Sequence, residues 1–153
     1  MKPDLTVSRH EFYVLIVEEP EDFTLFFKRT PYPCLIWAGR STSAAFKADL
    51  VRRLIQSNCR YVVCAGTECQ AWETAADEAF VNSDADFNPP DERHVMTTAH
   101  EGESPDEVAF FFVNLTNFDD HDFRRYAVMF IGADESTRRE VMARIEHYAK
   151  VAI

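Results

Sequence analysis

Residues 60–74 read RYVVCAGTECQAWET. The stretch opens with an apolar run rich in β-branched side chains, which is typical of a buried strand, and Gly66 ends that run. The alanine-rich residues that follow predict a helix over 68–81, with Trp72 on its inner face. The segment therefore predicts a strand that turns directly into a helix, which is the repeating unit of α/β sheets.

The same alternation of apolar runs and helical patterns recurs along the chain. It predicts four further strands, at 12–18, 33–39, 94–99 and 124–132. It also predicts three further helices, at 41–58, 104–115 and 135–153. Residues 19–29 fit a short helix that begins near Pro20, and the return strand of a hairpin is the competing interpretation. With that helix included, each of the five strands is followed by a helix.

The helix at 41–58 has recognisable ends. Ser41 or Thr42 is expected to cap its start, because their hydroxyl groups can accept hydrogen bonds from the first free amides. Asn58 is expected to end it in a left-handed conformation. An apolar stripe faces the sheet, and the basic side chains expected to point away from it are Lys47, Arg52 and Arg53.

Strands that alternate with helices imply a mainly parallel sheet that is covered on both faces. A capping box formed by Ser104 and Glu107 favours helix over strand for the residues FFFV at 110–113. At 153 residues, the chain has the size of one domain. We therefore expect a single three-layer α/β domain over 1–153, with a mainly parallel five-stranded sheet of the flavodoxin-like or Rossmann-like kind.

The charge of the chain restricts its partners. Its formal net charge is −10, from 26 acidic against 16 basic residues, and the basic residues form no evident patch. Such a surface repels phosphate backbones, so nucleic acid is not expected as a partner, whereas a protein with a basic surface suits it. No apolar run approaches the ~18 residues of a membrane span and no signal-peptide core is evident, so we expect no membrane contact and a cytoplasmic location.

Several common chemistries lack their motifs in this sequence. There is no GxGxxG, no GxxxxGK[ST] and no GxSxG, so nucleotide-binding loops and the usual hydrolase elbow are not expected. The cysteines at 34, 59, 64 and 69 fit no CxxC zinc spacing, and the acidic run DDHD at 119–122 is interpreted as a solvated loop. We therefore predict no cofactor and no metal site.

In open parallel sheets, ligands bind beyond the carboxyl ends of the strands, near the point where the strand order reverses. The residues at and just beyond the carboxyl ends of the expected strands are therefore the candidates for ligand contact, together with Trp72 in the helix that follows one of them. They are Arg40, Ser41, Thr67, Cys69, Trp72, Thr97, Thr98 and His100. Within this set, GRSTS at 39–43 would present a helix N-terminus to an anion, with help from the Arg40 guanidinium.

Cys69 and His100 are the candidates for catalysis. Cys69 lies in the first turn of an expected helix, where the helix dipole favours the thiolate. His100 follows the neighbouring strand and would act as its base, assisted by Glu101 or Glu103. Against this, Glu68 beside Cys69 disfavours the thiolate, and cysteine is among the most commonly buried residues. A nucleophilic thiol and a structural cysteine remain alternatives, so enzymatic activity is left open.

Two segments, CRYVVCAGTECQAWE at 59–73 and ERHVMTTAHEGES at 92–104, resemble an uncharacterised bacterial domain family of unknown function. The matching residues are Cys59, Tyr61, Gly66, Cys69, Trp72 and Glu73, followed by Met96, Thr97, Thr98, His100 and Glu101. The chain departs from the family pattern at Ala99, where the family carries tryptophan, and at Gly102. The resemblance gives weight to these positions without assigning them an activity.

Two functions are consistent with these observations. The first is a non-catalytic binding or interaction module that recognises a protein partner with a basic surface. The second is a small-molecule site, with or without catalysis, at the carboxyl edge of the sheet, where Trp72 would form a wall. We favour binding over catalysis.

Overall fold

The computed structural model describes residues 2–24 and 30–151. The strands are β1 (Leu5–Val7), β2 (His10–Ile16), β3 (Tyr32–Ala38), β4 (Cys59–Gly66), β5 (Met96–His100) and β6 (Arg125–Ile131). The helices are α1 (Ala44–Gln56), α2 (Cys69–Asn82), α3 (Pro105–Asn114) and α4 (Glu135–Val151). Two short 3-10 turns, η1 (Pro20–Asp22) and η2 (Asp91–Arg93), lie in the connections.

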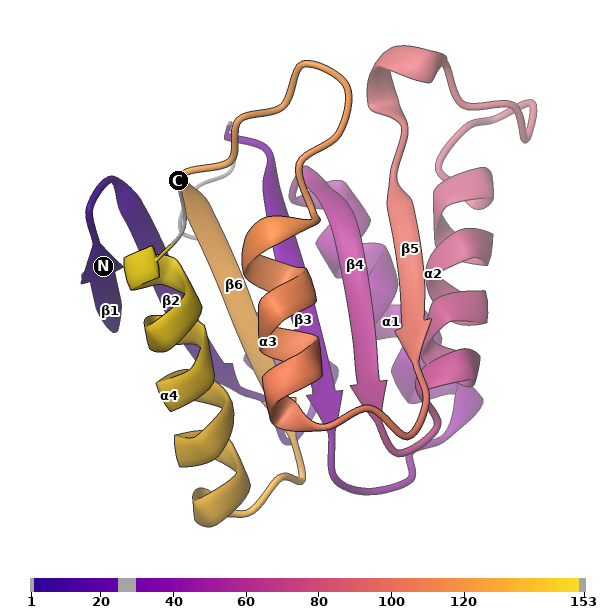
Figure 1. Cartoon of the computed structure of the whole chain (residues 1–153). Coiled ribbons are helices and arrows are strands. Elements are labelled where there is room, and N and C mark those ends of the chain that lie inside the picture. Colours follow the sequence, from indigo (N-terminus) through magenta and orange to yellow (C-terminus); the bar gives the residue numbers. More distant parts are fainter. Residues whose placement is uncertain (1, 25–29, 152–153) are drawn as a thin grey trace.

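The strands form one sheet in the order β1-β2-β6-β3-β4-β5. The pairs β2–β6, β6–β3, β3–β4 and β4–β5 are all parallel, and only β1 pairs antiparallel, with β2, among the described strands. The arrowheads of the parallel strands therefore point to one end of the molecule, as Figure 1 shows. The mainly parallel sheet expected from the sequence is confirmed, and all five expected strands form within a few residues of their predicted limits.

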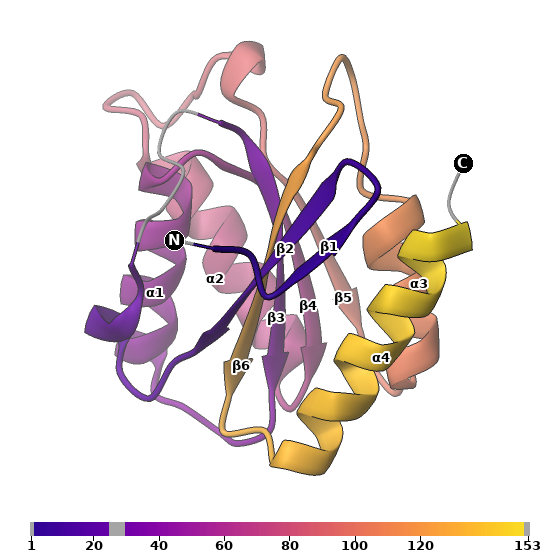
Figure 2. The same ribbon diagram turned by 90° about the vertical axis from the view of Figure 1, so that its left-hand side faces the viewer.

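The helices cover both faces of the sheet. Helices α1 and α2 lie against one face and α3 and α4 against the other (Figure 2). Each face has its own apolar core, and β3 between them is buried along its whole length, as a central parallel strand should be. The three-layer α/β architecture is therefore confirmed.

In the described part of the chain, the sheet has six strands rather than the five that the sequence predicts. The additional strand, β1, forms a hairpin with β2 in which Leu5 pairs with Phe12 and Val7 with His10. Ser8 takes a left-handed backbone conformation in the turn, with φ of 53°. Three residues are too few to show the alternation by which a strand is recognised, so this strand escapes sequence analysis.

The ends of α1 differ slightly from the prediction. Ser43 is the N-cap, because its Oγ accepts a hydrogen bond of 3.0 Å from the amide of Phe46, so the expected caps Ser41 and Thr42 were placed too early. Asn58 adopts the expected left-handed conformation just beyond the helix, with φ of 78°. The hydroxyl of Ser104 and the carboxylate of Glu107 form the predicted capping box at the start of α3.

The segment 19–29 is described only in part. The turn η1 occupies Pro20–Asp22, and Phe23 follows it with an extended backbone, so the expected helix does not continue through this point. Residues 25–29 lie outside the described part of the chain.

Candidate functional site

The strand order reverses between β3 and β6. After β3 the chain adds β4 and then β5 on one side of β3, and after α3 it returns to form β6 on the other side. At this point the loops after β3 and β6 pack backbone against backbone. The amide of Gly39 donates a hydrogen bond of 2.7 Å to the carbonyl of Ile131. A Cβ on Gly39 would overlap the carbonyl oxygen of Gly132, so only glycine permits this approach.

Arg40 spans the same junction instead of projecting from it. Its side chain lies on Gly132, its guanidinium donates a hydrogen bond of 3.0 Å to the carbonyl of Glu18, and its Cζ lies 5.3 Å from the centre of the Phe46 ring. Ser41, beside it, is exposed. Arg40 therefore connects the loops after β2, β3 and β6, and this role accounts for its position without an anion.

Glu68 ties the start of α2 to the loop before α1. Its Oε1 accepts a hydrogen bond of 3.0 Å from the Thr42 amide and one of 3.1 Å from Lys47 Nζ. Lys47 Nζ also donates to the Thr42 carbonyl at 2.7 Å, and only 5% of Lys47 is exposed. The prediction that Lys47 points away from the core is therefore wrong. A lysine can be buried in this way because its charge is paired and its ammonium hydrogen atoms have acceptors.

Cys69 is the first residue of α2, as expected, but its thiol faces the core. Only 3% of the residue is exposed, and it packs within the cluster under α1 and α2. Burial raises the pKa of the Cys69 thiol, and the carboxylate of Glu101 raises it further. Thr67 before it is exposed, and its amide donates a hydrogen bond of 2.8 Å to the Ala38 carbonyl. The environment of Cys69 therefore favours a neutral thiol.

His100 is held by two side chains near the end of β5. Its Nδ1 lies 3.0 Å from Glu103 Oε2, and its Nε2 lies 2.8 Å from the Thr98 hydroxyl. Because a carboxylate only accepts hydrogen bonds, Nδ1 carries the hydrogen atom, and in the neutral ring Nε2 accepts from Thr98. The ring packs edge-on against Phe111 of α3 at 4.5 Å between centroids, and 5% of His100 is exposed. The Thr98 hydroxyl, the His100 ring and the Glu103 carboxylate are thus hydrogen-bonded in series, and both ring nitrogens have a partner.

The thiol of Cys69 and the ring of His100 lie on opposite faces of the sheet. Cys69 belongs to the core beneath α1 and α2, whereas the His100 ring contacts α3. These two pairs of helices cover opposite faces of the sheet (Figure 2). The remaining edge candidates are also engaged with the protein. Trp72 is fully buried, Thr97 Oγ1 donates to Asp77 at 2.6 Å, and Glu101 accepts a hydrogen bond of 2.7 Å from Gln70. The structure therefore brings the side chains of Thr98, His100 and Glu103 together, whereas the Cys69 thiol meets the backbone of His100 and not its ring.

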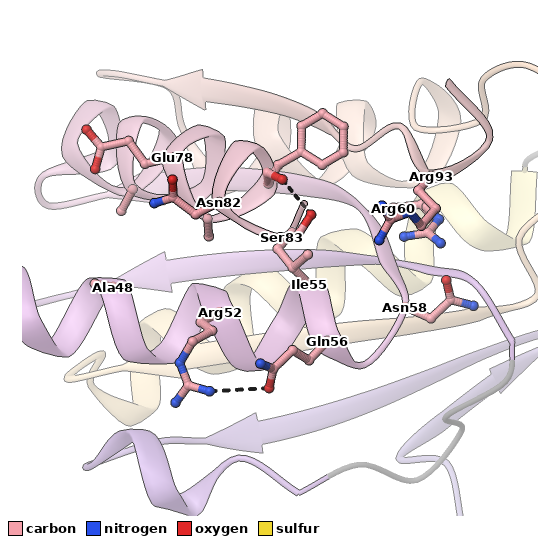
Figure 3. A pocket seen from close by; sticks show the side chains of 13 residues that line it. Ala48, Arg52, Ile55, Gln56, Asn58, Arg60, Glu78, Asn82, Ser83 and Arg93 are labelled. Atoms are coloured by element: carbon pink, nitrogen blue, oxygen red, sulfur yellow. Dashed lines mark hydrogen bonds between the residues drawn. The ribbon is translucent and has the colours of Figure 1, made fainter. Parts of the chain in front are cut away.

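A groove between α1 and α2 lies near the opposite end of the sheet, where β4 begins (Figure 3). It has a volume of about 680 Å³. Its wall is formed by Ala48, Arg52, Ile55, Gln56, Asn58, Arg60, Ala75, Glu78, Ala79, Phe80, Asn82, Ser83 and Arg93. The apolar side chains come from the facing sides of the two helices, and the polar ones lie around them. We refer to this feature as the α1–α2 groove.

The α1–α2 groove was not predicted from the sequence. Its residues come from α1, β4, α2 and the connection that leads to β5, and none of them belongs to a recognised motif. One indication was present, because Arg60 interrupts the otherwise apolar run at the start of its strand. The small residues Ala75 and Ala79 lie on the inner face of α2, and their size leaves part of the space between the helices open.

In the part of the chain that the structure describes, no three His, Cys, Asp or Glu side chains gather as they would around a metal ion. Over the same residues, every helix is too short or too polar to cross a membrane.

Comparison with known proteins gives a family but no activity. No curated protein matches the chain significantly. A family model described as a domain of unknown function, DUF7684, matches residues 12–150. This range includes β2 from Phe12 onward, β3 to β6 and the helices α1 to α4 apart from the last residue of α4. This agrees with the resemblance to an uncharacterised family, and the chain belongs to the DUF7684 family.

Proposed function

We propose that this protein is a non-catalytic binding protein and that its ligand occupies the α1–α2 groove. The observation that carries the proposal is the groove itself. A volume of about 680 Å³ lies within the range of roughly 300–1,000 Å³ that is usual for small-molecule sites. Its wall combines apolar side chains with polar and charged ones, which would fix the orientation of a ligand.

The environments of the candidate catalytic residues support binding rather than catalysis. A nucleophilic cysteine requires a thiolate and access to substrate, whereas burial both covers Cys69 and raises its pKa. His100 would have to release Thr98 or Glu103 before its ring could serve another group.

A ligand screen by thermal denaturation tests the proposal. A ligand present at about 100 times its dissociation constant is expected to stabilise the protein by roughly 2.7 kcal/mol. The variant Ala48→Trp, at an exposed position on the wall of the groove, should abolish this stabilisation. Ala143→Trp, at an exposed position on α4, is the matched control and should retain it. A ligand that stabilises Ala48→Trp as strongly as the wild type would contradict the proposal.

Recognition of a basic protein partner is a second candidate, supported by the net charge of −10. Acidic side chains follow β5 and β6 at the carboxyl edge of the sheet, where Glu101 and Glu135 are both exposed. Opposite charge steers association and makes it salt-dependent.

Binding of polylysine tests this candidate. Polylysine should bind the wild type more tightly than it binds the double variant Glu101→Lys with Glu135→Lys. The pair Asp86→Lys with Glu92→Lys, which changes the net charge equally at the other end, should bind like the wild type. Equal weakening by both pairs would count against this edge.

A further inference from the structure

One end of the α1–α2 groove holds two arginine side chains. Arg60 comes from β4 and Arg93 from η2, and Figure 3 shows their guanidinium groups beside each other. The position of Arg60 has a local cause. Tyr32 of β3 pairs with Cys59, and the next residue, Pro33, pairs with Tyr61, so Arg60 is the extra residue of a β-bulge. A bulge redirects the side chain of its extra residue, and here that side chain lines the groove.

The positive charge at this end is only partly compensated within the protein. Among the described residues, the guanidinium of Arg60 makes no hydrogen bond or ion pair. Arg93 forms an ion pair with Asp84 at 3.4 Å, and nearly half of the arginine side chain is exposed. Burial lowers the pKa of Arg60, and the neighbouring charge of Arg93 acts in the same direction. Arg60 and Arg93 thus hold two like charges near each other in a chain whose net charge is −10. A bound anion would relieve the repulsion between them.

Another hollow in the molecule offers a comparison. It lies near the starts of β2 and β6, has a volume of about 510 Å³ and is lined by Arg9, Arg124 and Arg125. Two of these arginines are compensated, because Arg9 pairs with Asp122 at 2.9 Å and Arg125 pairs with Glu11 at 3.3 Å. Among the described residues, Arg60 has no such carboxylate.

The rest of the α1–α2 groove indicates what the anion would be attached to. Ile55 of α1 and Ala79 and Phe80 of α2 provide apolar surface along the groove. Glu78 lies at the end away from Arg60 and Arg93 (Figure 3), and its carboxylate would repel a second negative group there. The charge of Arg52 is already paired with Asp49. The groove thus combines one basic end with an apolar middle.

We propose that the α1–α2 groove binds a small organic anion, with its carboxylate or phosphate group between Arg60 and Arg93 and its apolar part along Ile55, Ala79 and Phe80. This inference rests on the proposed function and adds the chemical class of the ligand to it. Guanidinium groups suit both kinds of anion, because their donors form paired hydrogen bonds with carboxylate and phosphate oxygens.

Calorimetric titration with three matched probes tests the inference. Octanoate and octyl phosphate carry the two candidate anions on one chain, and octanamide is the neutral counterpart of octanoate. We expect at least one anion to bind tighter than octanamide by about tenfold or more, since charge-assisted hydrogen bonds are roughly twice as strong as neutral ones. The tighter anion identifies the head group.

Variants separate the two proposals. Arg60→Gln should weaken binding of the preferred anion by about tenfold and leave octanamide unaffected. Arg139→Gln, which removes an exposed arginine of α4 paired with Glu135, is the control and should bind like the wild type. Two results would overturn the anion inference. One is that anion and amide bind with equal affinities that do not change in Arg60→Gln, and the other is that neither anion binds. Anion binding that persists in Ala48→Trp would instead overturn the groove as the site.

Discussion

Glu68 joins two loops at the carboxyl edge of the sheet, because one of its oxygens accepts hydrogen bonds from both Thr42 and Lys47. It does so from a left-handed backbone conformation, with φ of 58°, which is uncommon for a residue with a side chain. The hydrogen bond from the Thr42 amide is the main cause that lowers the pKa of the Glu68 carboxyl, and the hydrogen bond from Lys47 adds to it. These contacts make the stability of the protein depend on pH.

The lowered pKa of Glu68 predicts a loss of stability in acid. Below the ordinary glutamate pKa of 4.5, the unfolded chain binds a proton at this position more readily than the folded chain does. The free energy of unfolding should therefore fall as the pH drops through 4.5 toward the folded pKa. Glu68→Gln should show a flatter dependence in urea denaturation measured over this range. A slope equal to that of the wild type would mean that the contacts do not favour the charged carboxylate.

Cys69 is predicted to be unreactive in the folded protein. Its burial and raised pKa leave little thiolate at neutral pH, and the other three cysteines are fully buried. Iodoacetamide followed by mass spectrometry should label none of the four thiols in the native state and all four in urea. Rapid labelling of Cys69 alone in the folded protein would restore it as a candidate nucleophile.

At the scale of the elements, the turn between β4 and α2 depends on Gly66. Its φ is 82°, and a Cβ would overlap the carbonyl oxygen of Ala38 on the neighbouring strand. Gly102 is a matched comparison, since its φ is 71° and a Cβ there would meet no atom within 4 Å.

The two glycines therefore make a paired prediction. Gly102→Ala should lower the free energy of unfolding by roughly 1–2 kcal/mol, which is the cost of a left-handed conformation for an L-residue. Gly66→Ala should lower it by roughly 3 kcal/mol or more, because the overlap with Ala38 adds to that cost. Urea denaturation measures both. Similar losses in the two variants would show that contact with β3 does not restrict the turn.

The sequence predicted the elements well because their signals are local. The apolar run of β4, the capping box at Ser104 and the left-handed Asn58 each depend on a few adjacent residues. Lys47 was misplaced because its acceptors lie on other segments: Glu68 is at the start of the next helix, and helical periodicity carries no information about that contact. The hairpin strand β1 was missed because three residues show no period.

At the scale of the whole molecule, the candidate binding site lies away from the edge that topology predicts. Ligands in open parallel sheets usually sit where the strand order reverses, but here the loops after β3 and β6 contact each other and Arg40 packs on them. The α1–α2 groove lies instead toward the starts of the strands. It could not be read from the sequence, because Arg60 and Arg93 are brought together only by a β-bulge and a connecting turn.

The most direct test of the α1–α2 groove is an NMR titration of the ¹⁵N-labelled protein with the anion that calorimetry selects. The amide signals of Asn58, Ala79 and Ser83 at the groove should shift with ligand concentration, and those of Gly66 and Glu101 at the carboxyl edge should remain in place. Shifts confined to the carboxyl edge would contradict the account and return the site to the ends of the strands.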